Sequence, residues 1–348
     1  MVDSIAVVHS EGSYWSRLII DELEAASIEV ISIEIDSFRE ISGQRSSLSR
    51  LVRLASSAAS AMLDLARRRP HRLLCLYGGT NAVASSVLAL FCQRRKPVVF
   101  LGGSDFYRIH GPSRSIAFAA YRRASLLLCA GDQLADDVRE EGTLGSPVSW
   151  HHGTRLPPEP QETIKSPGDV LRVVVSRSLE SVYDPSTVMR ACALLSTDQQ
   201  IGLTFLASGK QAHTYEQEAQ DYAGNDALRI SFGGGYRPDE LTELLRSAHV
   251  FVSAPHSDGR PTSVIECVLN GLPLVLSDIP ANRSLVDLLG ATDVAFFEPG
   301  SAPGLADAIR STVDDFDDRA ASAFDRARSE RSRFDSKVAI AKLLDLMA

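Results

Sequence analysis

Two carboxylates, Asp258 and Glu266, stand on either side of a glycine turn with seven residues between them. The stretch from Asp258-Gly259 onward predicts a tight loop that enters a helix near Ser263. The first amides of a helix have no intrahelical partners and lie at the positive end of its dipole, so they bind anions. A carboxylate on each side of the turn could accept hydrogen bonds from hydroxyl groups. A nucleoside diphosphate sugar presents this combination of an anion and hydroxyls.

The same residues also fit a purely structural interpretation. Ser263-Val-Ile-Glu266 matches a capping box, in which Ser263 is the N-cap and Glu266 reaches back to the Ser263 amide. Asp258-Gly259 is a common turn dipeptide. Both interpretations predict a helix over 263–270, and they differ in whether the polar groups serve the helix or a ligand.

The longer run from Ser257 to Pro280 resembles the donor-site signature of the family 4 glycosyltransferases, which are retaining enzymes of the GT-B fold. In that signature an acidic residue, seven residues and a glutamate are followed by a small-residue turn and a strand that ends in Ser-Asp. Segments 97–105, 173–177 and 241–255 also resemble parts of that family. The resemblance implies an α/β protein with two Rossmann-like domains facing across an interdomain cleft.

The resemblance also implies roles for individual residues. Glu266 would hold the ribose hydroxyls, Asp258 the hydroxyls of the transferred sugar, and Arg177 and Lys210 the diphosphate. Asp258, Arg177 and Lys210 are therefore the expected catalytic residues. The other expected donor contacts are Gly259, Arg260, Pro261, Thr262, Ser263, Val264, Gly234 and Tyr236, and the expected acceptor-side residues are Gly103, Asp105 and His9.

The function implied is transfer of a hexose, with retention, from a nucleotide sugar to a glycan or lipid-linked acceptor in cell-surface polysaccharide biosynthesis. No metal or other cofactor is expected, since Arg177, Lys210 and the helix dipole would neutralise the diphosphate. The sequence departs from the family at Val182, where lysine is common, and at Gly102, where histidine is common. A catalytically silent nucleotide-sugar-binding partner is therefore an alternative, and a GT-B sugar-nucleotide epimerase is another.

The order of apolar runs and amphipathic stretches predicts two α/β domains within the 348 residues. The linker-like composition of 156–169 separates them. We expect an acceptor-binding domain over 1–160, a donor-binding domain over 161–330, and a last helix over 331–348 that packs back on the first domain.

Charge and composition limit the partners. The net charge is −8, which argues against a nucleic-acid ligand, but residues 45–72 contain seven arginines and one acid. A basic helix predicted over 46–69 could contact anionic lipid headgroups, or it could be a solvated helix face. The sequence contains no recognisable signal peptide, and its five cysteines fit reduced core thiols. A cytoplasmic protein, with a location at the inner membrane face as a further hypothesis, is expected.

Overall fold

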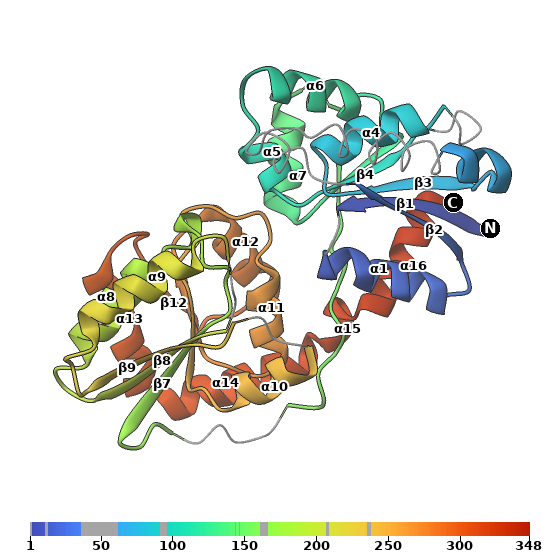
Figure 1. Cartoon of the computed structure of the whole chain (residues 1–348). Helices are drawn as coiled ribbons and strands as arrows, with labels where there is room; N and C mark the ends of the chain where they lie inside the picture. The colour runs from blue at the N-terminus through green and yellow to red at the C-terminus, as the bar shows by residue number, and fades with distance from the viewer. Residues whose placement is uncertain are drawn as a thin grey trace. The chain divides into compact units, whose positions relative to one another are not determined.

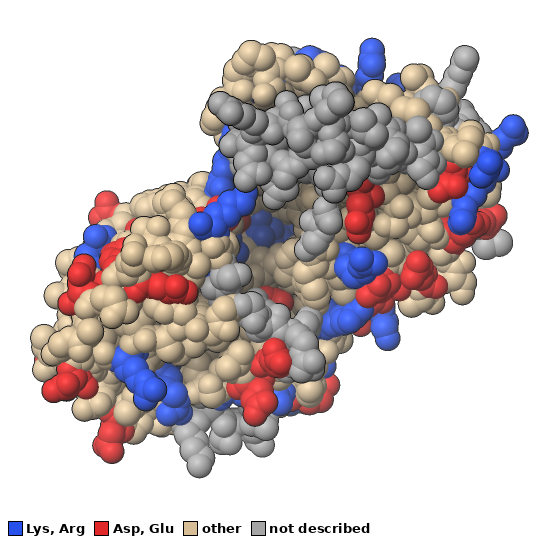
Figure 2. All heavy atoms as spheres, in the orientation of Figure 1, with Lys and Arg blue, Asp and Glu red and all other residues tan. Residues whose placement is uncertain are grey.

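The computed structural model describes residues 2–10, 13–35, 62–90, 96–142, 144–145, 147–160, 166–206, 209–234 and 238–348. The chain forms two compact units (Figure 1). The first contains residues 1–154 and 334–348, and the second contains residues 155–333. Acidic and basic side chains are interspersed over the visible face of both units (Figure 2).

The first unit is built on a parallel six-stranded sheet with the order β2-β1-β3-β4-β5-β6. After β2 the chain crosses back to place β3 on the other side of β1, so the strand order reverses between β1 and β3. The strands are β1 (Ser4–Ser10), β2 (Glu29–Ile35), β3 (Arg72–Leu76), β4 (Val98–Leu101), β5 (Leu126–Cys129) and β6 (Pro147–Ser149).

Helices cover both faces of this sheet, which explains why its strands are continuous apolar runs. Along β1, Ile5 and Val7 belong to one buried cluster, whereas Ala6 and Val8 belong to another on the opposite face. The helices are α1 (Tyr14–Ala25), α4 (Thr80–Leu88), α5 (Ser104–Tyr107), α6 (Gly111–Tyr121), α7 (Asp132–Glu140) and a helix over 62–68.

The C-terminal helix α16 (Ser336–Met347) belongs to the first unit. It packs against α1 and contributes Ile340, Leu343 and Met347 to the main core of that unit. The indole of the buried Trp150 donates a 3.0 Å hydrogen bond to the carbonyl of Ala339 in α16. The chain leaves this unit after Thr154 and returns to it at Phe334. The departing and returning segments pair, because the Thr154 amide donates to the Phe334 carbonyl at 2.8 Å.

The second unit repeats the parallel architecture in the order β12-β11-β10-β7-β8-β9. The chain runs outward from β7 to β9 and then crosses back to place β10 beside β7. Ligands of open parallel sheets bind at the carboxyl ends of strands where the order reverses, here β7 and β10. The strands are β7 (Val170–Val175), β8 (Gln200–Phe205), β9 (Leu228–Phe232), β10 (Val250–Ser253), β11 (Leu274–Ser277) and β12 (Ala295–Phe297).

Helices on both faces bury this second sheet as well. The main core cluster joins apolar residues of the central strands to α8 and α13, which pack against each other. The helices are α8 (Pro185–Leu195), α9 (Ala212–Glu218), α10 (Pro238–Arg246), α11 (Thr262–Leu269), α12 (Pro280–Leu289), α13 (Ala302–Asp314), α14 (Phe316–Ser329) and α15 (Arg331–Phe334), with one-turn 3₁₀ segments at Ser181–Tyr183 and Ala219–Tyr222.

Some expectations from the sequence need correction or lie outside the described residues. The chain contains β6, β12, α12 and α14, which the periodicity did not indicate. Of the predicted helix 46–69, the structure describes only 62–68 as helix, and residues 36–61 lie outside the described ranges. Cys75, Cys129, Cys192 and Cys267 are buried free thiols, whereas Cys92 is not described. No helix in the described part of the chain is long and apolar enough to cross a membrane.

Gly153 allows the returning chain to lie against the departing one. Its φ is +70°, and a Cβ atom there would lie 2.6 Å from the backbone N and Cα of Ser336. We therefore expect Gly153→Ala to lower the free energy of unfolding by about 2 kcal/mol or more, since it combines backbone strain with overpacking. Chemical denaturation measures this change. Gly145→Ala is the matched control, because a Cβ at Gly145 meets nothing within 4 Å. Equal stability of the two variants would contradict the prediction.

Candidate functional site

The candidate site lies at the carboxyl ends of β7 and β10, the neighbouring strands where the second sheet reverses its order. Arg177 follows β7 by two residues, and Asp258 follows β10 by five. Because the strands are parallel and adjacent, their ends bring these two distant residues to the same edge. Helix α11 begins at Thr262, directly after the loop that contains Asp258.

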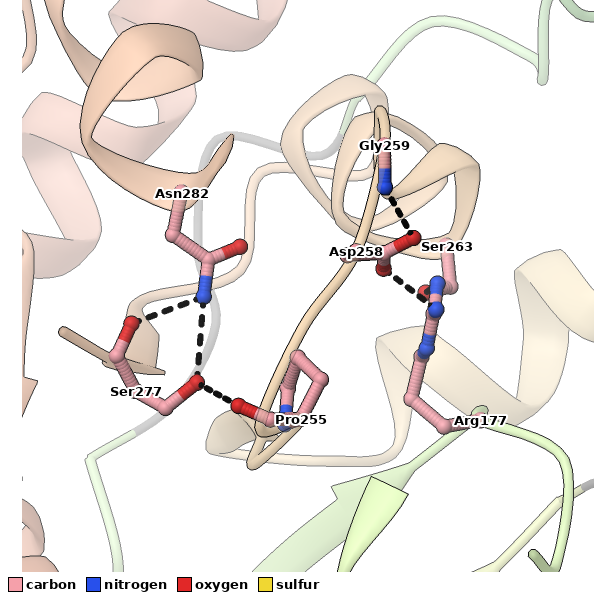
Figure 3. A network of polar contacts seen from close by, with 7 residues as sticks. All are labelled: Arg177, Pro255, Asp258, Gly259, Ser263, Ser277 and Asn282. Atoms are coloured by element: carbon pink, nitrogen blue, oxygen red, sulfur yellow. Dashed lines mark hydrogen bonds and ion pairs between the residues drawn. The ribbon is translucent and has the colours of Figure 1, made fainter. Parts of the chain in front are cut away.

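Arg177 is the centre of one of the two groups of polar contacts drawn in Figure 3. Its guanidinium forms an ion pair with the Asp258 carboxylate and donates a 3.0 Å hydrogen bond to the Ser263 hydroxyl. Both charged side chains are mostly buried, with 10% of Arg177 and 13% of Asp258 exposed. The other Asp258 oxygen accepts a 2.8 Å hydrogen bond from the Gly259 amide. The cation is therefore held at the beginning of α11.

The ring of Tyr183 supports the same cation, with the guanidinium carbon of Arg177 4.3 Å from the ring centroid. Tyr183 follows Val182, the position where the resembling family commonly has lysine. The Val182 carbonyl accepts a 2.9 Å hydrogen bond from the amide of His256, whose imidazole lies 3.3 Å from the Asp184 carboxylate. These contacts join the β7–α8 loop to the β10–α11 loop. No local sequence pattern indicated the contribution of Tyr183.

The capping-box interpretation of α11 is wrong. The N-cap is Pro261, the helix begins at Thr262, and Ser263 lies inside the first turn. The Ser263 hydroxyl accepts from Arg177 instead of capping the helix. The Val264 amide, one of the first amides of the helix, donates to the Pro261 carbonyl at 3.0 Å.

Glu266 lies one turn further along α11 and is half-buried. Burial raises the pKa of its carboxyl group to about 8, and the nearby positive charge of Arg177 opposes part of the rise. The group is therefore largely protonated at neutral pH. In that form it can donate one hydrogen bond as well as accept others, which suits contact with sugar hydroxyls.

The remaining donor-side residues are placed as follows. Lys210 is exposed in the turn before α9, and this turn contacts the β7–α8 loop, since the Gln211 amide donates to the Leu179 carbonyl at 3.2 Å. Gly234 has a φ of +68° after β9, whereas Tyr236 lies outside the described residues. Gly259, Arg260 and Pro261 form the loop that leads into α11, and Thr262 is the first residue of that helix.

A second network, at the end of β11, holds the loop between β10 and α11 in place. The Ser277 hydroxyl donates to the Pro255 carbonyl at 2.8 Å, and the side-chain amide of Asn282 donates to the Ser277 carbonyl at 2.8 Å (Figure 3). These bonds tie the start of α12 to the segment that follows β10. Pro280 at the first position of α12 was a helix signal that the sequence interpretation did not use.

The expected acceptor-side residues organise loops of the first unit. The Asp105 carboxylate accepts hydrogen bonds from the amides of Gly78 at 2.6 Å, Gly102 at 2.9 Å and Gly103 at 2.9 Å. His9 is buried, and its ring nitrogens lie 2.8 Å from the Ser32 hydroxyl and 3.1 Å from the Ser10 carbonyl. The side chains of Asp105 and His9 are thus engaged within the unit. No group of three metal-ligating side chains occurs in the described ranges.

The two parallel six-stranded units give this chain the GT-B fold of glycosyltransferases. The chain is similar to HepE of Anabaena in complex with UDP and glucose, at a TM-score of 0.75 and 15% identity over 99% of each chain. It is similar to sucrose-phosphate synthase from Thermosynechococcus elongatus, at 0.75 and 15% over 99% of this chain and 98% of that one. A Rickettsia africae glycosyltransferase gives 0.73 and 13% over 99% and 97%.

The second unit also matches a family by its sequence. Residues 159–328 match the family model described as "Glycosyl transferases group 1". The matched region includes the network around Arg177 and the whole of α11. No curated protein matches the chain.

The raised pKa of Glu266 predicts a pH dependence of stability. Between about pH 4.5 and 8 the native protein keeps a proton that the unfolded chain has lost, so stability should fall as pH rises through this window. Glu266→Gln should remove that fall, on the order of a few kcal/mol. Denaturation over this pH range provides the measurement. The exposed Glu216→Gln serves as control, and a Glu266→Gln profile parallel to wild type would refute the assignment.

Proposed function

We propose that the chain is a retaining glycosyltransferase of family 4 that transfers a sugar from a nucleoside diphosphate sugar to a glycan or lipid-linked acceptor. The observation that carries this proposal is the convergence of Arg177, Asp258 and the first turn of α11 at the reversal point of the second sheet. The match of residues 159–328 to a glycosyltransferase model supports it. UDP is the favoured nucleotide, because the similar HepE structure contains UDP and glucose.

The proposed chemistry assigns each group a task. The bond between the anomeric carbon and the diphosphate oxygen breaks, and negative charge grows on the leaving phosphate. Arg177, Lys210 and the amides at the start of α11 stabilise that charge, so a metal is not required. The acceptor oxygen bonds to the anomeric carbon on the same face, and the leaving phosphate takes its proton. Glu266 holds the ribose hydroxyls, and Asp258 holds those of the transferred sugar.

We assign the acceptor to the first unit, where Asp105 and His9 act as scaffolds for the loops at the carboxyl edge of its sheet. A role in cell-surface polysaccharide synthesis at the cytoplasmic face of the membrane extends this proposal. The family-type lysine is replaced by Val182, and Tyr183 supports Arg177 in its place.

A thermal-shift screen against UDP, GDP, ADP and TDP tests the donor site. We expect one nucleotide, UDP, to stabilise the protein clearly, and Glu266→Ala and Arg177→Ala to abolish the shift, since each removes a group assigned to the ligand. Arg190→Ala is the control, because Arg190 is an exposed residue of α8 whose guanidinium donates a hydrogen bond to the Thr187 hydroxyl at 2.8 Å and has no role assigned in the donor site. The absence of a thermal shift with all four nucleotides would contradict the proposal.

Slow hydrolysis of the donor in the absence of acceptor separates a transferase from a silent binder. A transferase releases free sugar and nucleoside diphosphate, whereas a silent binding protein shows the thermal shift and no release. An epimerase would instead return an altered sugar on the nucleotide.

Asp258 forms an ion pair with the Arg177 guanidinium, so a bound diphosphate would compete with Asp258 for that cation. Asp258→Asn should therefore strengthen binding of UDP alone by about 3- to 10-fold, since the cation no longer has to leave a charged partner. The same change should weaken discrimination between a UDP-sugar and UDP, since the group that holds the sugar is altered. Isothermal titration with both ligands gives these values. Asp307→Asn, which breaks an exposed pair with Arg310, is the control. Weaker UDP binding by Asp258→Asn would contradict this competition.

A further inference from the structure

The segment 80–125 of the first unit differs in charge from the chain as a whole. It contains seven lysines and arginines and one acid, Asp105, in a chain of net charge −8. The Asp105 carboxylate is directed at the backbone amides of Gly78, Gly102 and Gly103, and is not presented beside the basic residues. The described residues Lys96, Arg122 and Arg123 are exposed. Arg114 of α6 forms an ion pair with Glu141 at 2.8 Å, so among the described residues that are exposed the positive charge of this surface comes from Lys96, Arg122 and Arg123.

Apolar side chains are exposed on two helices of the same segment. Leu90, which follows α4, is 68% exposed, and Val87 of α4 is 47% exposed. Ile116 of α6 is 57% exposed. Helices α4 and α6 pack against each other.

The faces of α6 explain how charge and apolar residues come together. Ala117, Phe118, Ala120 and Tyr121 are buried, whereas Ile116, Ala119, Arg122 and Arg123 recur at spacings of three and four on the exposed face. Over the position of α6, at the top of Figure 2, basic side chains protrude and no acidic side chain is visible. We call the exposed residues Val87, Leu90, Ile116, Arg122 and Arg123 the α4–α6 surface.

We propose that the α4–α6 surface docks on an anionic lipid bilayer. Apolar tips flanked by arginines suit the boundary of headgroups and acyl chains, where the apolar groups leave water and the guanidinium groups meet phosphates. A nucleic acid would match the charge but would leave Leu90 and Ile116 without an apolar partner. A second copy of this surface would bring like charges together. The proposal stands independently of the proposed glycosyl transfer.

Co-sedimentation of the full chain with vesicles tests the docking. We expect binding to phosphatidylcholine vesicles that contain phosphatidylglycerol, loss of binding at high salt, and no binding to pure phosphatidylcholine. Each basic residue near such a surface contributes a factor of about five, so Arg122→Glu/Arg123→Glu should weaken binding by more than tenfold. Leu90→Ser/Ile116→Ser should weaken it several-fold with no change in charge.

Lys337→Glu/Lys342→Glu on the exposed side of α16 provides the matched control, since it makes the same change in charge within the same unit. The affinity of this control for the vesicles should fall by only about twofold, which is the loss caused by the change in net charge alone. It should stay well above the affinity of Arg122→Glu/Arg123→Glu. Thermal unfolding confirms that each variant is folded. Equal losses in the two charge variants, or no binding of the wild-type chain to anionic vesicles at low salt, would overturn the proposal.

Discussion

The second unit depends on one partly buried ion pair at the point where its sheet reverses order. Arg177 and Asp258 come from loops that follow different strands, and each is largely withdrawn from water. Breaking such a pair by removing one partner leaves the other charge poorly solvated, so the two loops are held together by the need to keep both charges matched. The Ser263 hydroxyl and the Tyr183 ring complete the surroundings of the cation. These contacts hold the Arg177 guanidinium beside the first turn of α11.

The order of the strands explains why that pair can form at all. Residues 177 and 258 are far apart in the chain, but β7 and β10 are neighbours because the crossover after β9 returns to the starting strand. Asn282 and Ser277 then fix the adjacent loop from the side of β11. In the first unit the corresponding edge is organised by Asp105 and Tyr121, and the Tyr121 hydroxyl accepts from the Gly79 amide at 2.7 Å. Both edges thus use side chains to satisfy loop amides.

The alternation of apolar and amphipathic stretches predicted most of the fold, because buried parallel strands and their covering helices have distinct periods. The runs Leu228–Phe232 and Val250–Ser253 coincide with β9 and β10. The three-residue strands β6 and β12 are too short to show a period, and α14 is so polar that it resembles a solvated segment.

The candidate site was predictable where local spacing decides it and unpredictable where tertiary contacts do. The sequence indicated the loop before α11 and the strand-end Arg177. It did not indicate that Ser263 would bond to that arginine instead of capping the helix, since both partners satisfy the same hydroxyl. The contact of Tyr183 with Arg177 depends on the path of the loop after β7, which no local pattern specifies.

The return of α16 to the first unit affects the order in which the protein can fold during synthesis. Trp150 and the neighbouring core remain uncovered until residues 336–347 have left the ribosome. The second unit is continuous in sequence, so it can complete its own core earlier. The unit that is translated first is therefore the last to be finished, and during that interval its unfinished face is available to chaperones or to aggregation.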